Sequence, residues 1–214
     1  MGIVRFHMTI SLDGFTSGLN QRPGKPFGDN TEALNEWVFR LRSFQEMRGL
    51  GGGETGPSDD VVRERMANLG AVVMGRHMFG GGTGPRPEPQ WNGWWGSEPP
   101  FHAPVFVLTH YPRPPQPMSE GTTFHFVTDG IDAALSRARE AAGSKDVVIG
   151  GGATTVRQYL RAGAVDEFEM HLLPTLVGAG ERLFDDLEGA FGQLKQVRVV
   201  ADEGVTHIKY RVDR

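Results

Sequence analysis

Three short, wholly apolar runs place the strongest restriction on how this chain can fold. They occupy residues 71–74, 105–108 and 147–149, and no polar side chain interrupts any of them. Runs of this length and composition are typical of strands that are covered on both faces, as in a parallel sheet. Parallel neighbours need long crossover connections, which are usually helices. The runs therefore predict an α/β protein whose sheet is mostly parallel.

The rest of the chain alternates between extended and helical patterns. Apolar residues at every second position predict further strands over residues 3–11, 123–127 and 167–172. Helical periodicity predicts helices over residues 31–48, 58–69, 131–142 and 153–161. Thr31 and Ser58 are the expected N-caps of the first two helices. Two final strands, over 196–200 and 205–212, are expected to form a hairpin, so we predict a sandwich of helices around a mixed sheet.

Glycine and proline are concentrated in two stretches, which predict insertions near 49–57 and 80–103 within a single domain over residues 1–214. Residues 80–117 hold ten of the 14 prolines and three of the four tryptophans. Such a composition disfavours both helix and central strand, and loops of this length usually act as lids or binding loops. Trp91, Trp94 and Trp95 are candidates for a stacking lid, for a dimer contact, or for a plug at the sheet edge.

Composition excludes several classes of function. The chain of 214 residues has no cysteine, so disulfides, thiol catalysis and cysteine-bound metals are ruled out. The net charge is −4 and the 22 basic residues form no run, so we expect no nucleic-acid partner. The seven histidines lack the spacing of a metal site. We also expect no membrane segment and a cytoplasmic location, because no apolar stretch reaches the roughly 18 residues of a membrane helix.

Polar turns follow each of the three apolar runs. Because the carboxyl ends of parallel strands meet at one edge of a sheet, we expect these turns to lie together. A glycine turn that leads into a helix suits a phosphate, and Arg76, with His77, His110 and Arg113, adds cationic side chains. The same glycine turn also occurs as a plain strand-to-helix connection. The turns are Gly75-Arg76-His77, Leu108-Thr109-His110 and Gly150-Gly151-Gly152-Ala153-Thr154-Thr155.

Four segments in register resemble the dihydrofolate-reductase-like superfamily. Residues 71–79 and 146–152 are similar to the two cofactor turns of dihydrofolate reductases. Residues 10–15, and 165–174 with 178–184, are similar to the reductase domain of bifunctional riboflavin-biosynthesis enzymes. The resemblance extends from about residue 6 to residue 210. It implies a dihydrofolate-reductase-like three-layer sandwich, a stand-alone relative of the C-terminal reductase domain of those enzymes.

The resemblance also implies a cofactor and a set of site residues. NADPH would meet Gly75, Arg76 and His77 with its adenosine-side phosphates, and Arg76 is the candidate for the 2′-phosphate. Leu108, Thr109 and His110 would line the adenosine groove, and the turn from Gly150 to Thr155 would hold the pyrophosphate. Asp13, in the turn beside the nicotinamide, is the candidate catalytic residue. Trp37 and Trp94 are our candidates for substrate binding, and Trp94 belongs to the insertion, which neither of these enzymes has. The implied reaction is hydride transfer to a small, heterocyclic substrate, as in dihydrofolate reductase or 5-amino-6-(5-phosphoribosylamino)uracil reductase. The resemblance also implies a homodimer.

Other interpretations stay open at this point. Leu34 stands where dihydrofolate reductases carry an acid, and His7 stands close to the place of a first-strand lysine in the riboflavin-type enzymes. The substrate is therefore unassigned, and the proton donor is Asp13, a carboxylate of the first helix, or water. A non-catalytic protein that senses NADPH or a metabolite is the alternative function. A third interpretation, in which the glycine turns are only structural, predicts no nucleotide affinity.

Overall fold

The computed structural model describes residues 2–22, 24–80, 91–189 and 192–213, so residues 81–90 of the predicted insertion at 80–103 lie outside the description. The strands within the described ranges are β1 Val4–Ser11, β2 Phe15–Ser17, β3 Leu69–Gly75, β4 Pro104–Leu108, β5 Gln116–Pro117, β6 Thr123–Val127, β7 Asp146–Gly151, β8 Glu167–Leu173, β9 Glu181–Arg182, β10 Gln193–Asp202 and β11 Val205–Asp213. These residues form a nine-stranded sheet in the order β10-β11-β8-β1-β7-β3-β4-β6-β5, and a small second sheet pairs β2 with β9.

The middle of the large sheet is parallel, as the apolar runs predict. β8, β1, β7, β3, β4 and β6 run in the same direction, with register pairs such as Val73 with Phe106 and Val72 with Val148. Residues 71–74 of β3 expose at most 2% of their surface. Both faces of this strand are therefore covered, which is why its sequence lacks the polar alternation of an exposed strand.

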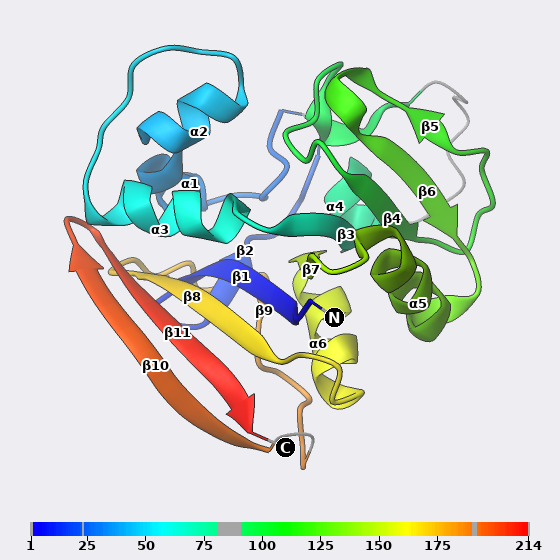
Figure 1. Cartoon of the computed structure of the whole chain (residues 1–214). Helices are drawn as coiled ribbons and strands as arrows, with labels where there is room; N and C mark the ends of the chain where they lie inside the picture. Colours follow the sequence, from blue (N-terminus) through cyan, green and yellow to red (C-terminus); the bar gives the residue numbers. More distant parts are fainter. Residues whose placement is uncertain (1, 23, 81–90, 190–191, 214) are drawn as a thin grey trace.

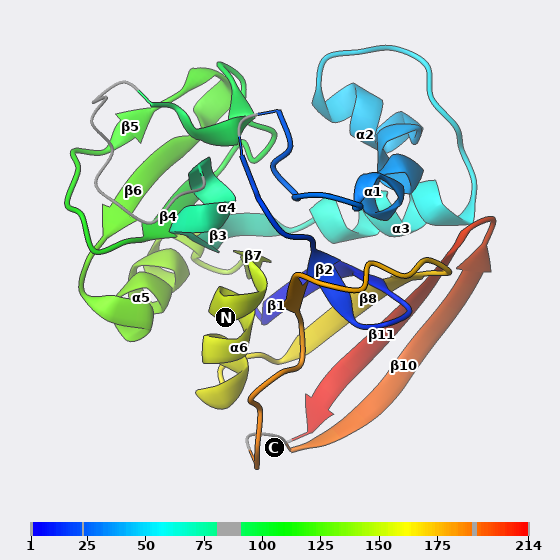
Figure 2. The same cartoon turned by 180° about the vertical axis from the view of Figure 1, so that it is seen from behind.

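Helices cover the two faces of the sheet (Figures 1 and 2). One face carries α1 Glu32–Phe39, α2 Arg42–Met47 and α3 Pro57–Met66, and the other carries α5 Gly130–Ala142 and α6 Ala153–Arg161. α5 packs on β3, β4 and β7, and α6 packs on β7 and β3. A short helix, α4 Arg76–Gly80, directly follows β3, and single 3₁₀ turns lie at η1 Gly93–Trp95 and η2 Ser119–Gly121. The three-layer, mixed α/β architecture is the one predicted from the sequence.

The C-terminal hairpin is also present and is longer than predicted. β10 pairs antiparallel with β11, and β11 pairs antiparallel with β8, so the hairpin extends the sheet on one side. The turn between them contains Gly204, whose φ of 76° is a conformation that glycine adopts without strain. A register shift between Gln196 and Arg198 marks an irregularity in β10.

The predicted helix over 31–48 is wrong in one respect, because it is two helices. Leu41 adopts extended angles (φ −72°, ψ 146°) between α1 and α2. Its neighbours exchange backbone hydrogen bonds with the returning loop: the Arg42 N–H donates to the Glu54 carbonyl and the Glu54 N–H donates to the Arg40 carbonyl, both at 2.8 Å. The predicted insertion near 49–57 thus folds back and pairs where the helix breaks.

Of the two predicted N-caps, Thr31 occupies the N-cap position of α1 as predicted, whereas Ser58 is wrong. The Thr31 hydroxyl donates to the Gly28 carbonyl at 3.0 Å and makes no capping bond to α1. Ser58 lies within the first turn of α3, which begins at Pro57, and the helix ends at Met66 because Leu69 already belongs to β3. Ser58 is buried and takes part in a polar network described below. A cap assignment needs only local sequence, whereas these hydroxyls bond partners that are set by the tertiary fold.

Candidate functional site

The three polar turns meet at one edge of the sheet. Gly75, at the end of β3, is in register with Leu108 of β4, and Met74 is in register with Gly151 of β7. The residues that follow these positions are therefore neighbours, although 33 residues separate Gly75 from Leu108 in the sequence. The structure brings together the predicted cofactor turns at residues 75–77, 108–110 and 150–155.

Two of these turns are in direct contact. A β-carbon added at Gly75 would lie 2.3 Å from the Oγ1 atom of Thr155, in the first turn of α6. No residue with a side chain fits there without movement, so the backbone of Gly75 at the end of β3 lies directly against the Thr155 side chain. Thr155 exposes only 6% of its surface, so its hydroxyl faces Gly75, whereas Thr154 is exposed.

The glycine turn presents the start of a helix. Gly151 has a φ of 122°, which L side chains rarely adopt, and Gly152 is the N-cap of α6 with no side-chain capping bond. The Val156 N–H donates to the Gly152 carbonyl at 3.1 Å, so earlier amides of α6 point out of the helix. These amides and the helix dipole form a place where an anionic group is favoured.

Asp13 is tied into the loops at the end of β1. Its carboxylate accepts hydrogen bonds from the Ser11 hydroxyl (2.6 Å), the Val177 N–H (3.1 Å) and the Gly178 N–H (2.8 Å). The Ser11 hydrogen bond, followed by the two backbone amides, lowers the pKa of Asp13 to about 2. Gly14 completes the turn with a φ of 89°. At neutral pH this carboxylate is ionised and joins the loop at residues 177–178 to the first strand.

The two tryptophans proposed for substrate binding lie in different parts of the protein. Trp37 of α1 exposes 4% of its surface, and its indole N–H donates to the Thr9 hydroxyl at 3.4 Å. Trp94 lies beside the first cofactor turn, where its indole N–H donates to the His77 carbonyl at 3.1 Å. The structure therefore places Trp94 beside the predicted cofactor turn at residues 75–77 and Trp37 on the buried face of the first helix.

The neighbouring tryptophans of the insertion pack on the sheet. Trp91 and Trp95 contact the apolar cluster that includes Phe79 and Phe124. Arg113, whose guanidinium lies 4.6 Å from the centre of the Phe126 ring, donates to the Trp91 carbonyl at 3.0 Å. Among the three alternatives for the tryptophans, this arrangement favours a plug at the sheet edge for Trp91 and Trp95.

A hydrogen-bonded chain of buried side chains, which links β8, β11 and α3, was not predicted from the sequence. His171 of β8 and His207 of β11 are fully buried, and their Nδ1 atoms lie 2.8 Å apart. The Ser58 hydroxyl lies 2.9 Å from His207 Nε2, and Arg65 Nη1 lies 3.4 Å from His171 Nε2. Trp37 covers both imidazole rings, at 4.9 and 5.1 Å between ring centres. The only sequence signal for this chain is that each histidine occupies the non-apolar face of its strand.

The direction of this chain follows from the chemistry of its ends. A guanidinium can only donate, so His171 Nε2 accepts from Arg65 and the neutral His171 ring carries its proton on Nδ1. That proton is donated to His207 Nδ1, so His207 carries its own proton on Nε2 and donates it to Ser58. A second proton on either ring would have no acceptor within the chain.

Burial keeps these rings neutral. It lowers the pKa of His171 well below its usual range, and the charge of Arg65 acts in the same direction. Burial also lowers the pKa of His207 to about 4, although the carboxylate of Asp202 acts against it. The pKa of His7, on the adjacent strand, is lowered by burial and by Arg65 and Arg5.

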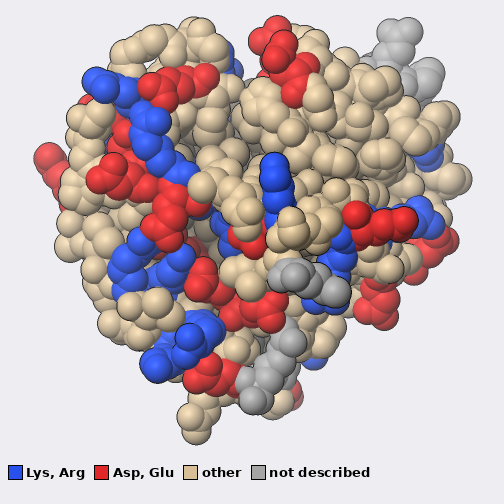
Figure 3. All heavy atoms as spheres, viewed as in Figure 1, with Lys and Arg blue, Asp and Glu red and all other residues tan. Residues whose placement is uncertain are grey.

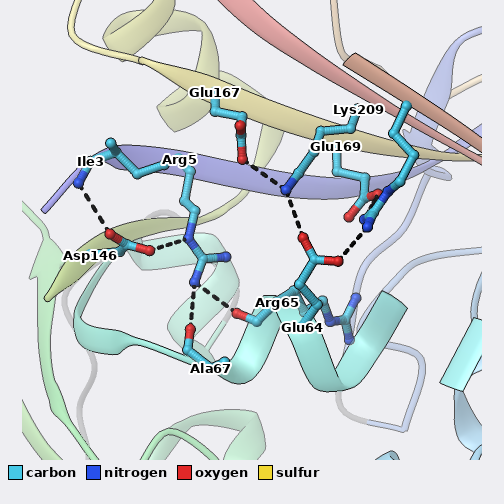
Figure 4. Close-up of polar contacts among 10 residues, drawn as sticks. Ile3, Arg5, Glu64, Arg65, Ala67, Asp146, Glu167, Glu169 and Lys209 are labelled. Atoms are coloured by element: carbon cyan, nitrogen blue, oxygen red, sulfur yellow. Dashed lines mark hydrogen bonds and ion pairs between the residues drawn. The ribbon is translucent and has the colours of Figure 1, made fainter. Parts of the chain in front are cut away.

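A charged cavity of about 190 Å³ adjoins Arg65, at the opposite end of the sheet from the three turns. Its walls are held by ion pairs (Figure 4): Arg5 with Asp146 at 2.9 Å, Lys209 with Glu64 at 2.9 Å and with Glu167 at 3.0 Å, and Arg198 with Glu169 at 2.9 Å. Figure 3 shows acidic and basic side chains interspersed where α3 meets the hairpin. The charged side chains around the cavity therefore pair with one another, and the cavity is separate from the edge where the predicted cofactor turns lie.

The described residues contain neither a cluster suited to a metal ion nor a helix suited to a membrane. No group of three or more histidine, aspartate and glutamate side chains is placed to hold a metal ion within the part of the chain that the structure covers. Nor does any helix among those residues have the length and apolar content needed to cross a bilayer.

Comparison with known proteins agrees with the fold. The sequence model described as "RibD C-terminal domain" matches residues 3–208. The uncharacterized protein YyaP of Bacillus subtilis (strain 168) is 31% identical over 86 residues, which is 40% of this chain and 45% of YyaP, so the match spans less than half of that relative.

Two solved structures share the architecture. A riboflavin biosynthesis protein from Shewanella sp. PV-4 superposes with a TM-score of 0.61 and 19% identity, covering 99% of both chains. Dihydrofolate reductase from Enterococcus faecalis, complexed with NADP(H) and RAB-propyl, superposes with a TM-score of 0.53 and 15% identity, covering 100% of this chain and 98% of the other. These similarities establish a dihydrofolate-reductase-like fold.

Proposed function

The chain belongs to the RibD C-terminal domain family, and we propose that residues 1–214 act as a single NADPH-dependent reductase domain that transfers a hydride to a small, heterocyclic substrate. The observation that carries this proposal is the meeting of the turns after β3, β4 and β7 at one sheet edge. The names of the similar structures, a riboflavin biosynthesis protein and a dihydrofolate reductase in complex with NADP(H), support the same class of reaction.

The residues at this edge fit NADPH. The bare backbone at Gly151 and Gly152 and the outward amides of α6 suit the pyrophosphate, which would lie over the helix N-terminus. Arg76 follows β3 and offers a planar donor set for the 2′-phosphate. When bound, NADPH supplies the hydride. The protein then has to hold the nicotinamide against the substrate and exclude water from it.

Asp13 is assigned to this reaction as the residue that orders the nicotinamide edge. Its three hydrogen bonds join the end of β1 to the loop at residues 177–178. Since its pKa of about 2 keeps it ionised at neutral pH, it is suited to hold this turn and not to supply a proton. A carboxylate of α1 or water is then the source of the proton that accompanies the hydride. Trp94 beside His77 then belongs to the wall of the cofactor site.

Titration with NADPH and, separately, NADH tests the proposal. We expect NADPH to bind at least about tenfold more tightly, and Arg76→Ala to remove most of that preference, a loss of roughly 1.5–3 kcal/mol for a charge-assisted hydrogen bond. Quenching of tryptophan fluorescence and energy transfer to the nicotinamide report both affinities. Arg139→Ala, on the exposed surface of α5, is the matched control and should leave the preference unchanged. If neither nucleotide binds at millimolar concentration, the protein is not a reductase of this kind.

A sensor of NADPH or a metabolite is the second candidate, and one observation favours it. Leu34, where dihydrofolate reductases carry an acid, exposes 1% of its surface and packs with Phe15 and Val177. This position therefore offers no carboxylate to a substrate. A sensor would bind NADPH but would oxidise it with none of the reducible heterocycles added. A reductase would oxidise NADPH when at least one of these heterocycles is present.

We extend the proposal to a homodimer through the outer strand of the hairpin. β10 ends the sheet in the described residues, and Leu194, Val197 and Val199 on it are exposed by 46, 50 and 49%. A long, exposed and apolar edge strand favours pairing with a second strand. We expect a dimer in light scattering and a monomer for Val197→Lys/Val199→Lys, while Leu50→Lys, on another exposed apolar residue, should remain dimeric. A monomeric wild-type protein would contradict the dimer.

A further inference from the structure

An exposed aromatic side chain, that of Tyr111, lies at the proposed cofactor edge and has no part in the proposed function described above. Tyr111, three residues beyond the end of β4, exposes 36% of its surface. The guanidinium carbon of Arg76 lies 4.8 Å from the centre of its ring. This distance is within the range of a cation–π contact. The residue expected to recognise the 2′-phosphate thus lies against a tyrosine from the neighbouring turn.

The position of Tyr111 is set by two hydrogen bonds that lead back to the sheet. Its backbone N–H donates to the hydroxyl of Thr109 at 3.1 Å. The backbone N–H of Thr109 in turn donates to the carbonyl of Val127, the last residue of β6, at 3.0 Å. Tyr111 therefore lies on a short turn anchored to a strand, although its ring is exposed.

The strand register explains why the two side chains meet. β3 and β4 are parallel neighbours, and Gly75 is opposite Leu108. Arg76 is the next residue beyond Gly75, so its side chain starts at the same level as the turn that carries Tyr111. Neither residue identifies the other in the sequence, because they are 35 positions apart.

An arginine held against an aromatic ring is well prepared to bind a phosphate. The guanidinium carries five N–H donors in one plane, and a contact with a single ring engages only part of the group. A free arginine side chain has many rotamers, and their loss opposes binding. A tyrosine that holds the guanidinium in one place reduces this loss without using the donors that a phosphate needs.

We propose that Tyr111, anchored by Thr109, is a positioning residue that holds Arg76 for the 2′-phosphate and so sets the preference for NADPH over NADH. This inference rests on the proposed function. It also gives Thr109 a different role from the groove contact implied by the family resemblance, because its hydroxyl accepts the Tyr111 N–H. Thr109 then acts through Tyr111 and Arg76.

The test compares Tyr111→Leu with Tyr111→Phe. The phenylalanine variant keeps the aromatic face and loses only the hydroxyl, so its ratio of NADH to NADPH dissociation constants should stay within about twofold of wild type. The leucine variant removes the face, and its ratio should fall by about two- to fivefold, as expected of an exposed cation–π contact. Binding of NADH should change little in either variant.

A double-mutant cycle with Arg76→Ala separates positioning from direct contact. If Tyr111 acts through Arg76, then Tyr111→Leu should have no further effect on NADPH affinity once Arg76 is alanine. An equal loss in both backgrounds would mean that Tyr111 touches the nucleotide itself, and the positioning role would be overturned. The NMR shift of the Arg76 side-chain N–H, measured without nucleotide, should move toward its random-coil value in Tyr111→Leu but not in Tyr111→Phe.

These outcomes also separate the inference from the function on which it rests. Strong NADPH preference that survives Tyr111→Leu contradicts the positioning role alone. Absence of binding by either nucleotide contradicts the proposed reductase and the inference together. An Arg76 signal that is the same in wild type and Tyr111→Leu overturns the stacking itself, whatever the nucleotides do.

Discussion

Acidification from pH 7 to pH 4 is expected to destabilise the protein by about 3 kcal/mol through His207 alone. The pKa of this histidine is lowered from 6.5 to about 4 in the folded protein. Between these values the unfolded chain binds a proton that the folded chain does not, so the free energy of unfolding falls as the pH falls. His171 and His7 have lowered pKa values as well and act in the same direction.

Urea unfolding at a series of pH values measures this effect. His207→Gln should be less stable than wild type at pH 7, because it disturbs the hydrogen bonds to Ser58 and His171, by about 1–3 kcal/mol. Its stability should nevertheless depend less steeply on pH between 6.5 and 4. His110→Gln, which removes an exposed histidine, is the control and should follow the wild-type curve. If the curves of unfolding free energy against pH are parallel for wild type and His207→Gln, then His207 does not cause the acid sensitivity.

The direction of the hydrogen-bonded chain can be observed directly. Two-bond nitrogen–proton NMR correlations distinguish the two neutral forms of a histidine ring. At neutral pH they should show His171 protonated on Nδ1 and His207 protonated on Nε2, since Arg65 can only donate to His171. The reverse assignment would mean that Arg65 does not set the direction of the chain.

Gly75→Ala is expected to reduce both stability and cofactor affinity. Its new β-carbon would lie 2.3 Å from Thr155 Oγ1, so β3 and the first turn of α6 must separate. Forcing an extra carbon into a packed contact typically costs about 1–3 kcal/mol. Because α6 starts at the glycine turn proposed for the pyrophosphate, the same movement should weaken NADPH binding. Urea unfolding and nucleotide titration measure the two effects.

A second substitution tests the cause of this loss. The same β-carbon would lie 3.6 Å from the Thr155 Cβ atom, an ordinary contact, so Gly75→Ala/Thr155→Ala should recover much of the lost stability. Gly51→Ala, where an added β-carbon meets nothing within 4 Å, is the matched control and should be close to neutral. Failure of the double variant to recover would show that the backbone at residue 75, and not the contact with Thr155, requires glycine.

Much of the fold follows from local patterns. The apolar runs at residues 71–74, 105–108 and 147–149 became β3, β4 and β7, and the helix over 153–161 has the bounds of α6. These elements could be predicted because a strand buried on both faces and an amphipathic helix leave a periodic record in the sequence. The break at Leu41 leaves no such record, since it depends on pairing with Glu54 from the returning loop.

The candidate site, like the fold, has features that the sequence predicts and others that depend on the tertiary structure. The turns after β3, β4 and β7 could be located because polar and glycine residues follow apolar runs, and the parallel sheet brings their ends together. The contact of Gly75 with Thr155 and that of Arg76 with Tyr111 could not be predicted, because each depends on strand register and side-chain direction. The position of Trp94 beside His77 likewise depended on the tertiary structure.

The sequence by itself determined the class of fold, the order of its elements and the polar turns that follow the apolar runs. These properties depend on hydrophobic periodicity and backbone chemistry, which each segment carries independently of its partners. Only the tertiary structure decided that His171 and His207 lie within hydrogen-bond distance, as fully buried rings beneath Trp37. Strand pairing sets that contact across 36 residues, and the energy of a buried polar group depends on its partner, which no single segment contains.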